Sequence, residues 1–218
     1  MGTSFSSPLV AGAAALLLDA KDDNPFSGLL TSYAAKTLFE QTAITAHQAL
    51  NDGGLVVPLA LQGSGLINAY NAVNTKTVIY PSQLLLNDTK FSAYKQTIYI
   101  NNLSGSIQTY KVSHVPAATV PTFDGTQVTV TPTFVNATAT ATFSKTTFQV
   151  FPFIPYSLTV TFTPPTGLAP ATFPVYSGQI IIAGSTDRVA ASYMGMAASM
   201  RDMQVLDTST FCQHLNAA

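Results

Sequence analysis

Apolar and polar residues follow two different patterns on either side of residue 75. In the first part, runs rich in Ala and Leu predict three helices, at 4–19, 33–42 and 66–73. The run at 4–19 carries small and aliphatic residues on every face, which is typical of a buried helix, and Pro8 lies early enough in it to be tolerated. An Asn-Asp-Gly-Gly stretch at 51–54 predicts a turn between the second and third helices.

From residue 76 onward, the chain switches to short β-branched runs separated by Pro and Gly clusters. The expected strands are 91–100, 107–113, 127–131, 156–163 and 176–182. The first two are expected to pair as a hairpin, and 176–182 has the composition of a more buried strand. Alternation is clearest at 156–163, where Tyr156, Leu158, Val160 and Phe162 share one face. Runs at this spacing predict an antiparallel β-sandwich.

The chain carries few charges, and this excludes one class of function. Charged residues make up 9% of it and the net charge is −1, so the sequence has no basic stretch of the kind that binds nucleic acid. The few carboxylates lack the spacing of a calcium-binding loop, so no metal and no cofactor are predicted. Cys212 is the one cysteine, which rules out an internal disulfide, and we interpret it as an incidental residue of the tail.

Three N-x-[ST] sequons favour a secreted, glycosylated protein. They begin at Asn87, Asn102 and Asn136, within Thr-rich strand sequence. The apolar run at 8–18 has the length of a signal-peptide core, but no basic residue precedes it and it begins with Pro. It is also shorter than the roughly 20 residues that span a bilayer, so we expect no membrane span. The expected location is extracellular, either free or associated with the cell wall.

The start of the chain places a serine at the head of the first predicted helix. Ser4 follows Gly2 and Thr3, and the first N–H groups of a helix are unpaired and point outward. Together with the helix dipole, these groups attract negative charge. A serine at this position has two interpretations: its hydroxyl caps the helix, which is the commoner role, or it attacks a carbonyl while its own N–H stabilises the oxyanion.

The segment from Gly2 to Gly12 resembles the serine-centred signature of the subtilisin-like serine proteases, G-T-S-x-[SA]-x-P-x-V-A-G. The specified positions are matched by Gly2, Thr3, Ser4, Ser6, Pro8, Val10, Ala11 and Gly12. The resemblance implies that Ser4 is the nucleophile and that its backbone N–H contributes to the oxyanion hole, with Gly2, Thr3 and Pro8 as supporting residues of the motif. It also implies a protein or peptide substrate for the full-length parent.

Two further stretches extend the resemblance. Residues 63–69 (GSGLINA) are similar to the segment that closes the catalytic domain in this family. Residues 176–182 and 192–195 are similar to strands of the fibronectin-III-like sandwich that follows in C5a-peptidase-like members. The expected fold class is therefore α+β: the C-terminal helices of an α/β subtilisin-like domain, followed by an antiparallel fibronectin-III-like β-sandwich. The expected domains are 1–75 and 76–197, with an irregular tail at 198–218.

The remaining triad residues of the family have no counterpart in this sequence. None of its histidines, His47, His114 and His214, begins a His-Gly-Thr motif, and neither Asp88 nor Asp207 begins Asp-[ST]-Gly. Since subtilases place Asp and His before Ser in the chain, the resemblance implies a missing upstream peptidase segment. We expect the isolated chain to be inactive, because a serine without a base is a poor nucleophile.

Two other functions stay open at this stage. The first is a non-catalytic extracellular module for binding or adhesion, in which Phe151, Phe153 and Tyr156 form an exposed patch, although such residues more often fill a core. The second is a small membrane-associated protein anchored by 8–18, which the length of that run disfavours.

Overall fold

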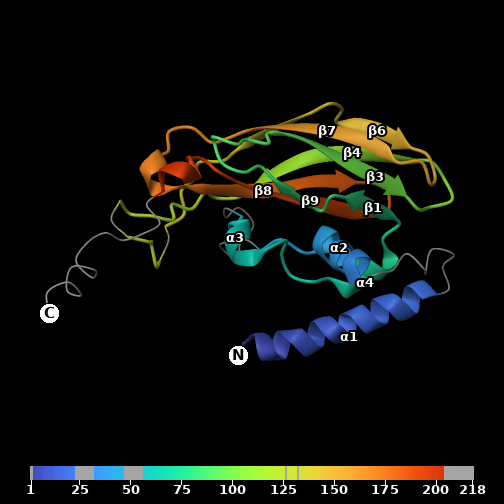
Figure 1. Cartoon of the computed structure of the whole chain (residues 1–218). Helices are drawn as coiled ribbons and strands as arrows, with labels where there is room; N and C mark the ends of the chain where they lie inside the picture. The colour runs from blue at the N-terminus through green and yellow to red at the C-terminus, as the bar shows by residue number, and fades with distance from the viewer. Residues whose placement is uncertain (1, 23–31, 47–55, 126, 132, 204–218) are drawn as a thin grey trace, which may run out of the picture.

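A layer of helices is joined to a two-sheet β-sandwich in the computed structural model, which describes residues 2–22, 32–46, 56–125, 127–131 and 133–203 (Figure 1). The helices come first: α1 (Thr3–Asp22), α2 (Ser32–Thr42), α3 (Leu59–Gln62) and α4 (Ala69–Asn74). The strands are β1 (Thr77–Tyr80), β2 (Gln83–Leu85), β3 (Lys95–Asn102), β4 (Gln108–Pro116), β5 (Thr140–Phe143), β6 (Thr147–Val150), β7 (Tyr156–Thr163), β8 (Val175–Ala183) and β9 (Arg188–Met196). Two 3₁₀ turns complete the described part, η2 (Pro170–Thr172) and η3 (Met200–Asp202). The predicted fold class is confirmed.

The strands form two sheets whose inward faces build one core. The first sheet has the order β1-β3-β7-β5 and the second β2-β9-β8-β4-β6. Pairing is antiparallel except between β2 and β9, which are parallel. The core between the sheets includes Ile79, Ile98, Tyr110, Leu158, Tyr176, Ile180 and Tyr193, all almost fully buried.

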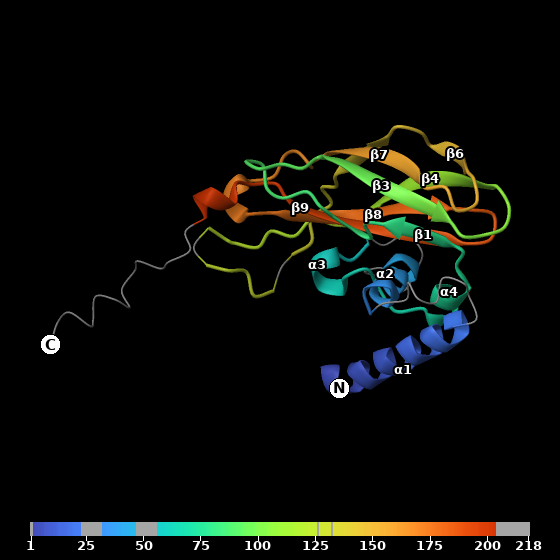
Figure 2. The same cartoon turned by 45° about the vertical axis from the view of Figure 1, so that its right-hand side comes forward.

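Strands β7 and β8 show how burial shaped the sequence. In β7, Leu158, Val160 and Phe162 are buried between the sheets while alternate Ser and Thr residues face outward, so this strand lies where the alternation predicted. Strand β8 is buried along nearly its whole length, as expected for 176–182. It is covered on both faces because α3 packs against β8 and β9 on the side away from the sandwich core, as Figures 1 and 2 show.

The predicted hairpin between 91–100 and 107–113 is wrong. Strand β3 pairs with β1 and β7, whereas β4 pairs with β6 and β8 in the other sheet. The loop at 103–107 therefore crosses from one sheet to the other. Both strands carry apolar residues with period two, and that pattern fixes which face is buried but not which strand lies alongside.

The alternating run at 127–131 is not a strand either. Its one pairing within the described residues is a single bridge between Phe123 and Val128. Val128 and Val130 are 71% and 94% exposed, so their apolar side chains have no sheet to pack on. The alternating pattern predicted a strand here, but such a pattern does not show whether a partner strand exists.

The helical part departs from expectation in two places. The helix predicted at 66–73 begins at Ala69, because the Asn68 side chain caps it by accepting a hydrogen bond from Asn71 N at 2.9 Å. Leu66 instead forms a bridge with Ile44. The short helix α3 was not predicted. The predicted turn at 51–54 and most of the tail at 198–218 lie outside the described residues.

Helix α1 forms as predicted but is not buried. Among its apolar residues only Leu17 is fully buried, in a small cluster with Leu38 and Phe39 of α2 and Ala72 of α4. Figures 1 and 2 both place α1 outermost, with α2 and α4 between it and the sandwich. The sequence correctly predicted an apolar helix, but the described residues leave most of its apolar side chains exposed.

Gln41 ties the helical layer to the sandwich. Its buried side-chain amide donates from Nε2 to Thr77 O at 2.9 Å and accepts from Ile79 N at 3.0 Å. These two backbone groups lie on the same side of β1, which is an outer strand of the first sheet. The amide of Gln41 thus makes the two hydrogen bonds that a neighbouring strand would make.

The candidate nucleophile and its surroundings

Ser4 lies in the first turn of α1, with its side chain exposed to solvent. The helix begins at Thr3, and Phe5 N donates to Gly2 O at 3.0 Å across its first turn. Residues 2–10 are all exposed, and no atom of the described chain comes within 4 Å of where a side chain at Gly2 would begin. The serine is therefore open to an incoming molecule. The structure places Ser4, Gly2, Thr3 and Pro8 together at this helix end.

The end of α1 that carries Ser4 is suited to a developing negative charge. The first N–H groups of the helix have no partner within it, and the first turn contains no acidic residue. Pro8 has a separate consequence that does not stabilise negative charge, because it has no N–H to donate to the carbonyl four residues earlier, which is that of Ser4. The backbone at Ser4 thus lacks one of its ordinary helical hydrogen bonds.

No general base accompanies Ser4 in the part of the chain that the structure describes. The Ser4 hydroxyl makes no hydrogen bond to another described residue. His47 and His214 lie outside the described ranges. His114 belongs to the sandwich, where its Nε2 lies 2.7 Å from the Tyr193 hydroxyl, and burial lowers its pKa from 6.5. A neutral histidine held by a core tyrosine is a structural residue of the sandwich.

An apolar groove runs along one side of α1. Val10, Ala14 and Leu18 of α1 line it together with Phe39 of α2 and the loop at 63–65, and they enclose about 650 Å³. The span Thr3–Lys21 is also long and apolar enough to cross a membrane, by length and composition. That span is longer than the run at 8–18 from which no membrane crossing was predicted. Signal sequences and core helices of soluble proteins meet the same criterion, so the span by itself assigns no location.

The three sequon asparagines lie in different surroundings. Asn87 and Asn136 are exposed. Asn102 is fully buried, and its Nδ2 donates to Ser106 O at 2.8 Å and to Val150 O at 3.0 Å. A glycan attaches through this same nitrogen, so the folded sandwich has no room for one at Asn102.

The aromatic residues near 150 divide between surface and core. Phe151 and Phe153 are 53% and 55% exposed, against the expectation that they fill the core. Tyr156 does pack inward, stacked on Phe148 with ring centroids 4.2 Å apart. The loop between β6 and β7 contains both phenylalanines and has a left-handed backbone at Phe153, whose φ is 60°.

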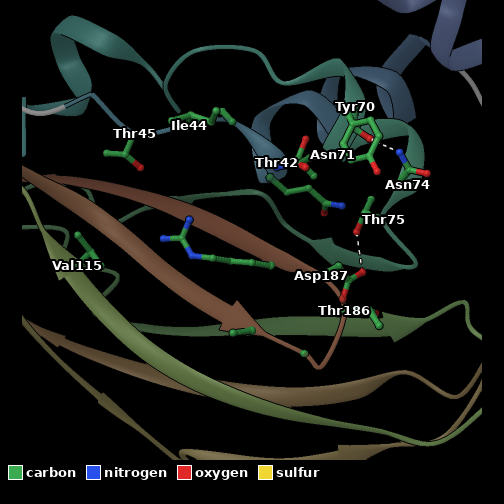
Figure 3. A pocket seen from close by; sticks show the side chains of 15 residues that line it. Thr42, Ile44, Thr45, Tyr70, Asn71, Asn74, Thr75, Val115, Thr186 and Asp187 are labelled. Carbon is green, nitrogen blue, oxygen red and sulfur yellow. Dashed lines mark hydrogen bonds between the residues drawn. The ribbon is translucent and has the colours of Figure 1, made fainter.

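A polar cavity between the helices and the sandwich was missed by sequence reasoning. It lies between α2 and α4 on one side and the turn from β8 to β9 on the other, and Figure 3 shows Tyr70, Asn71 and Asn74 near Thr75, which is hydrogen-bonded to Asp187. Thr75 and Asp187 are 112 positions apart in the chain, yet they are hydrogen-bonded. No local motif joins these residues, so only the fold brings them together.

The fold and the position of Ser4 define a chain of two parts, a serine-headed helical segment and an antiparallel β-sandwich. Comparison with known families agrees for both parts: residues 1–70 match the Subtilase family and residues 84–194 match the Fn3-like domain. The chain belongs to the Fn3-like domain family, and its helical segment is similar in sequence to the Subtilase family.

Several solved structures are similar to part of this chain at low sequence identity. The ASH/PapD-like domain of human CEP192 is 12% identical with a TM-score of 0.42, over 57% of this chain and 87% of that chain. The E. coli chaperone DraB is 8% identical with a TM-score of 0.34, over 56% of this chain and 53% of that chain. The C. elegans MSP family member WR4 is 10% identical with a TM-score of 0.29, over 57% and 99%. No curated protein matches the sequence.

Proposed function

We propose that Ser4 is the nucleophile of a secreted serine endopeptidase. The observation that carries the proposal is the subtilase motif that places an exposed serine in the first turn of an apolar helix. In the reaction, Ser4 Oγ attacks the carbonyl carbon of a peptide bond while a histidine takes its proton. The C–N bond then breaks, the amine leaves with that proton, and water hydrolyses the resulting ester of Ser4.

The described chain by itself should not carry out this reaction. No histidine or aspartate of the sequence fits the family's triad motifs, so the base and its orienting carboxylate must come from a preceding segment. Loss of a triad member in a protease of this kind lowers kcat by about 10⁴–10⁶. The chain in isolation is therefore an inactive part of the peptidase.

A comparison of the chain with its Ser4→Ala variant tests whether the isolated chain is inactive and whether any activity it has depends on Ser4. The 218-residue chain and its Ser4→Ala variant are incubated with a fluorogenic casein substrate and with a fluorophosphonate probe. Neither should hydrolyse casein or be labelled. Hydrolysis that disappears in Ser4→Ala would disprove the inactivity but support the nucleophile.

The nucleophile itself is tested on a longer product of the same reading frame. The sequence upstream of Met1 should encode His-Gly-Thr and Asp-[ST]-Gly motifs, and the product that contains them should be labelled by the fluorophosphonate at Ser4. A stop codon immediately upstream, or labelling that persists in Ser4→Ala, would contradict the proposal.

Secretion, free or with association to the cell wall, is part of the same proposal. The low charge of the chain and the two exposed sequons at Asn87 and Asn136 support it. Immunoblots of culture medium, cell wall and cytosol fractions should find the protein outside the cytosol, and recovery only in the cytosol would contradict secretion.

A second candidate function is a non-catalytic binding or adhesion module. The exposed pair Phe151 and Phe153 favours it, because aromatic residues commonly anchor protein contacts. In a cell-wall pull-down assay, Phe151→Ser should lose binding while Val130→Ser, which changes an even more exposed apolar residue elsewhere, should retain it. Equal binding by both variants, or no binding by the wild type, would exclude this function.

A further inference from the structure

The polar cavity between α4 and the β8–β9 turn has the dimensions of a ligand site. It encloses about 870 Å³, within the roughly 300–1,000 Å³ of typical ligand pockets. Four structural elements contribute to it: α2, α4, the end of β4 and the β8–β9 turn. Figure 3 shows side chains of α4 and of this turn that line it.

The one carboxylate in the lining is already saturated. Asp187 Oδ2 accepts hydrogen bonds from Thr75 Oγ1, Lys76 N and Thr77 N, each at 2.9 Å, and its Oδ1 accepts from Thr77 Oγ1 at 2.9 Å. Four donors compensate its charge and fix it to the segment that links α4 to β1. Asp187 therefore holds the wall of the cavity in place and is not available to a cationic ligand.

The lining offers donors that the described chain does not use. The Arg188 guanidinium is exposed and has no acceptor among the described residues, and the same holds for the Asn71 side-chain amide. The Tyr70 ring is 76% exposed at the rim. The positive charge of Arg188 favours a ligand that is anionic.

Nearby lysines add to the positive potential. Lys21 Nζ donates to Thr75 O, a lining residue, at 3.2 Å. Burial, followed by the neighbouring charge of Lys76, lowers the pKa of Lys21.

Part of the remaining wall is apolar. Ala43 and Ile44, which follow α2, Val115 of β4 and Ala183 of β8 contribute this part. A single carboxylate would fill only a small part of the volume, so the site suits an acidic group that carries aliphatic neighbours.

We propose that this cavity binds a carboxylate of a peptide, with Arg188 as its bidentate partner, Asn71 as a second donor and the apolar wall receiving the flanking side chains. Arg presents its N–H groups in a fork that matches both oxygens of a carboxylate. The inference is independent of the proposed role of Ser4, because none of the residues involved belongs to that motif. The carboxylate can come from a Glu side chain or from a peptide C-terminus.

Isothermal titration calorimetry of the full chain tests the proposal with three peptides. These are Ac-Leu-Glu-Leu-NH₂, its glutamine analogue Ac-Leu-Gln-Leu-NH₂, and Ac-Leu-Gln-Leu with a free C-terminus. One of the two carboxylate peptides should bind at least tenfold more tightly than the amide control, and which one does so identifies the source of the carboxylate. Equal affinity for all three, or no binding of any, would overturn the proposal.

Variants locate the binding to the cavity. Arg188→Met should lose at least tenfold in affinity, and Arg188→Lys should lose less, because it keeps the charge but not the fork. Arg201→Met changes an exposed arginine outside the cavity and should bind as the wild type does. If Arg188→Met proves unfolded by circular dichroism, Asn71→Ala takes its place, with a loss of several fold expected. Wild-type affinity in a folded Arg188→Met or Asn71→Ala protein would disprove the site.

Discussion

The hydroxyl of Tyr193 lies directly over Gly178, its cross-strand neighbour in β8. A methyl group at Gly178 would approach the Tyr193 hydroxyl oxygen to 2.5 Å. The arrangement is reciprocal, because a methyl group at Gly195 would approach the Tyr176 hydroxyl oxygen to 2.5 Å. Each strand carries Tyr-x-Gly, and antiparallel pairing sets each tyrosine opposite the other strand's glycine. The Tyr-x-Gly segments of β8 and β9 thus pack against each other in the core.

Gly178→Ala should destabilise the sandwich by about 1–3 kcal/mol, as overpacking of a dense core does. The neighbour that must move is a buried tyrosine hydrogen-bonded to His114, so it cannot swing away freely. Urea unfolding followed by circular dichroism measures the change. Gly105→Ala is the matched control, because no atom lies within 4 Å of its new methyl group. An unchanged midpoint for Gly178→Ala would contradict the packing described.

Leu17→Ala should release α1 from the helical layer. Leu17 is the fully buried residue of this helix, and truncation of such a leucine costs about 2–5 kcal/mol when the site cannot collapse. Leu16→Ala, which removes the same atoms from a side chain 63% exposed, should change stability by less than about 0.5 kcal/mol. Proteolysis at Lys21, followed by mass spectrometry, should be faster in Leu17→Ala alone. Equal rates in the two variants would show that α1 is not held by Leu17.

Lowering the pH below about 6.5 should weaken the sandwich through His114. Burial lowers the pKa of His114 in the folded state, so the unfolded chain takes up its proton first as the pH falls. The free energy of unfolding should therefore decline from pH 7 until the folded-state pKa is passed. His114→Asn should reduce this slope in urea titrations at pH 7.5, 6.5 and 5.5. The same slope in both proteins would mean that His114 is not the group responsible.

Glycosylation should be confined to two of the three sequons. Expressed through the secretory route of a eukaryotic host, the protein should carry glycans at Asn87 and Asn136, which are exposed, and none at the buried Asn102. Intact-mass spectrometry of the Asn87→Gln/Asn136→Gln double variant should show no glycan. Residual glycan at Asn102 would mean that modification precedes folding of β3.

The sequence predicted most securely the elements whose pattern reflects their burial. Strand β7 is buried on one face and alternates, and β8 is buried on both faces and is nearly all apolar. Helix α1 was predicted by its composition, but composition could not say that its apolar faces would be largely uncovered by the described residues. Residues 127–131 show the opposite error. Their apolar and polar residues alternate as in a strand, but Val128 and Val130 are exposed because no neighbouring strand among the described residues covers them.

Relationships between distant residues could not be predicted from the sequence. The strands that pair with β3 and β4 depend on how the two sheets stack, and the alternation of apolar residues along each strand does not predict this stacking. The cavity lined by Asn71 and Arg188 exists only because α4 packs beside the β8–β9 turn. Ser4 was different, because a motif of fixed spacing marks it within a few residues.

The amide of Gln41 occupies the positions at which a further strand would join β1. That border of the first sheet is therefore closed to extended peptides, whether from a second copy or from an unfolded neighbour. Open borders are where strand exchange and fibril growth begin. Strands from another chain could therefore extend this sheet only from β5, the strand at its opposite border.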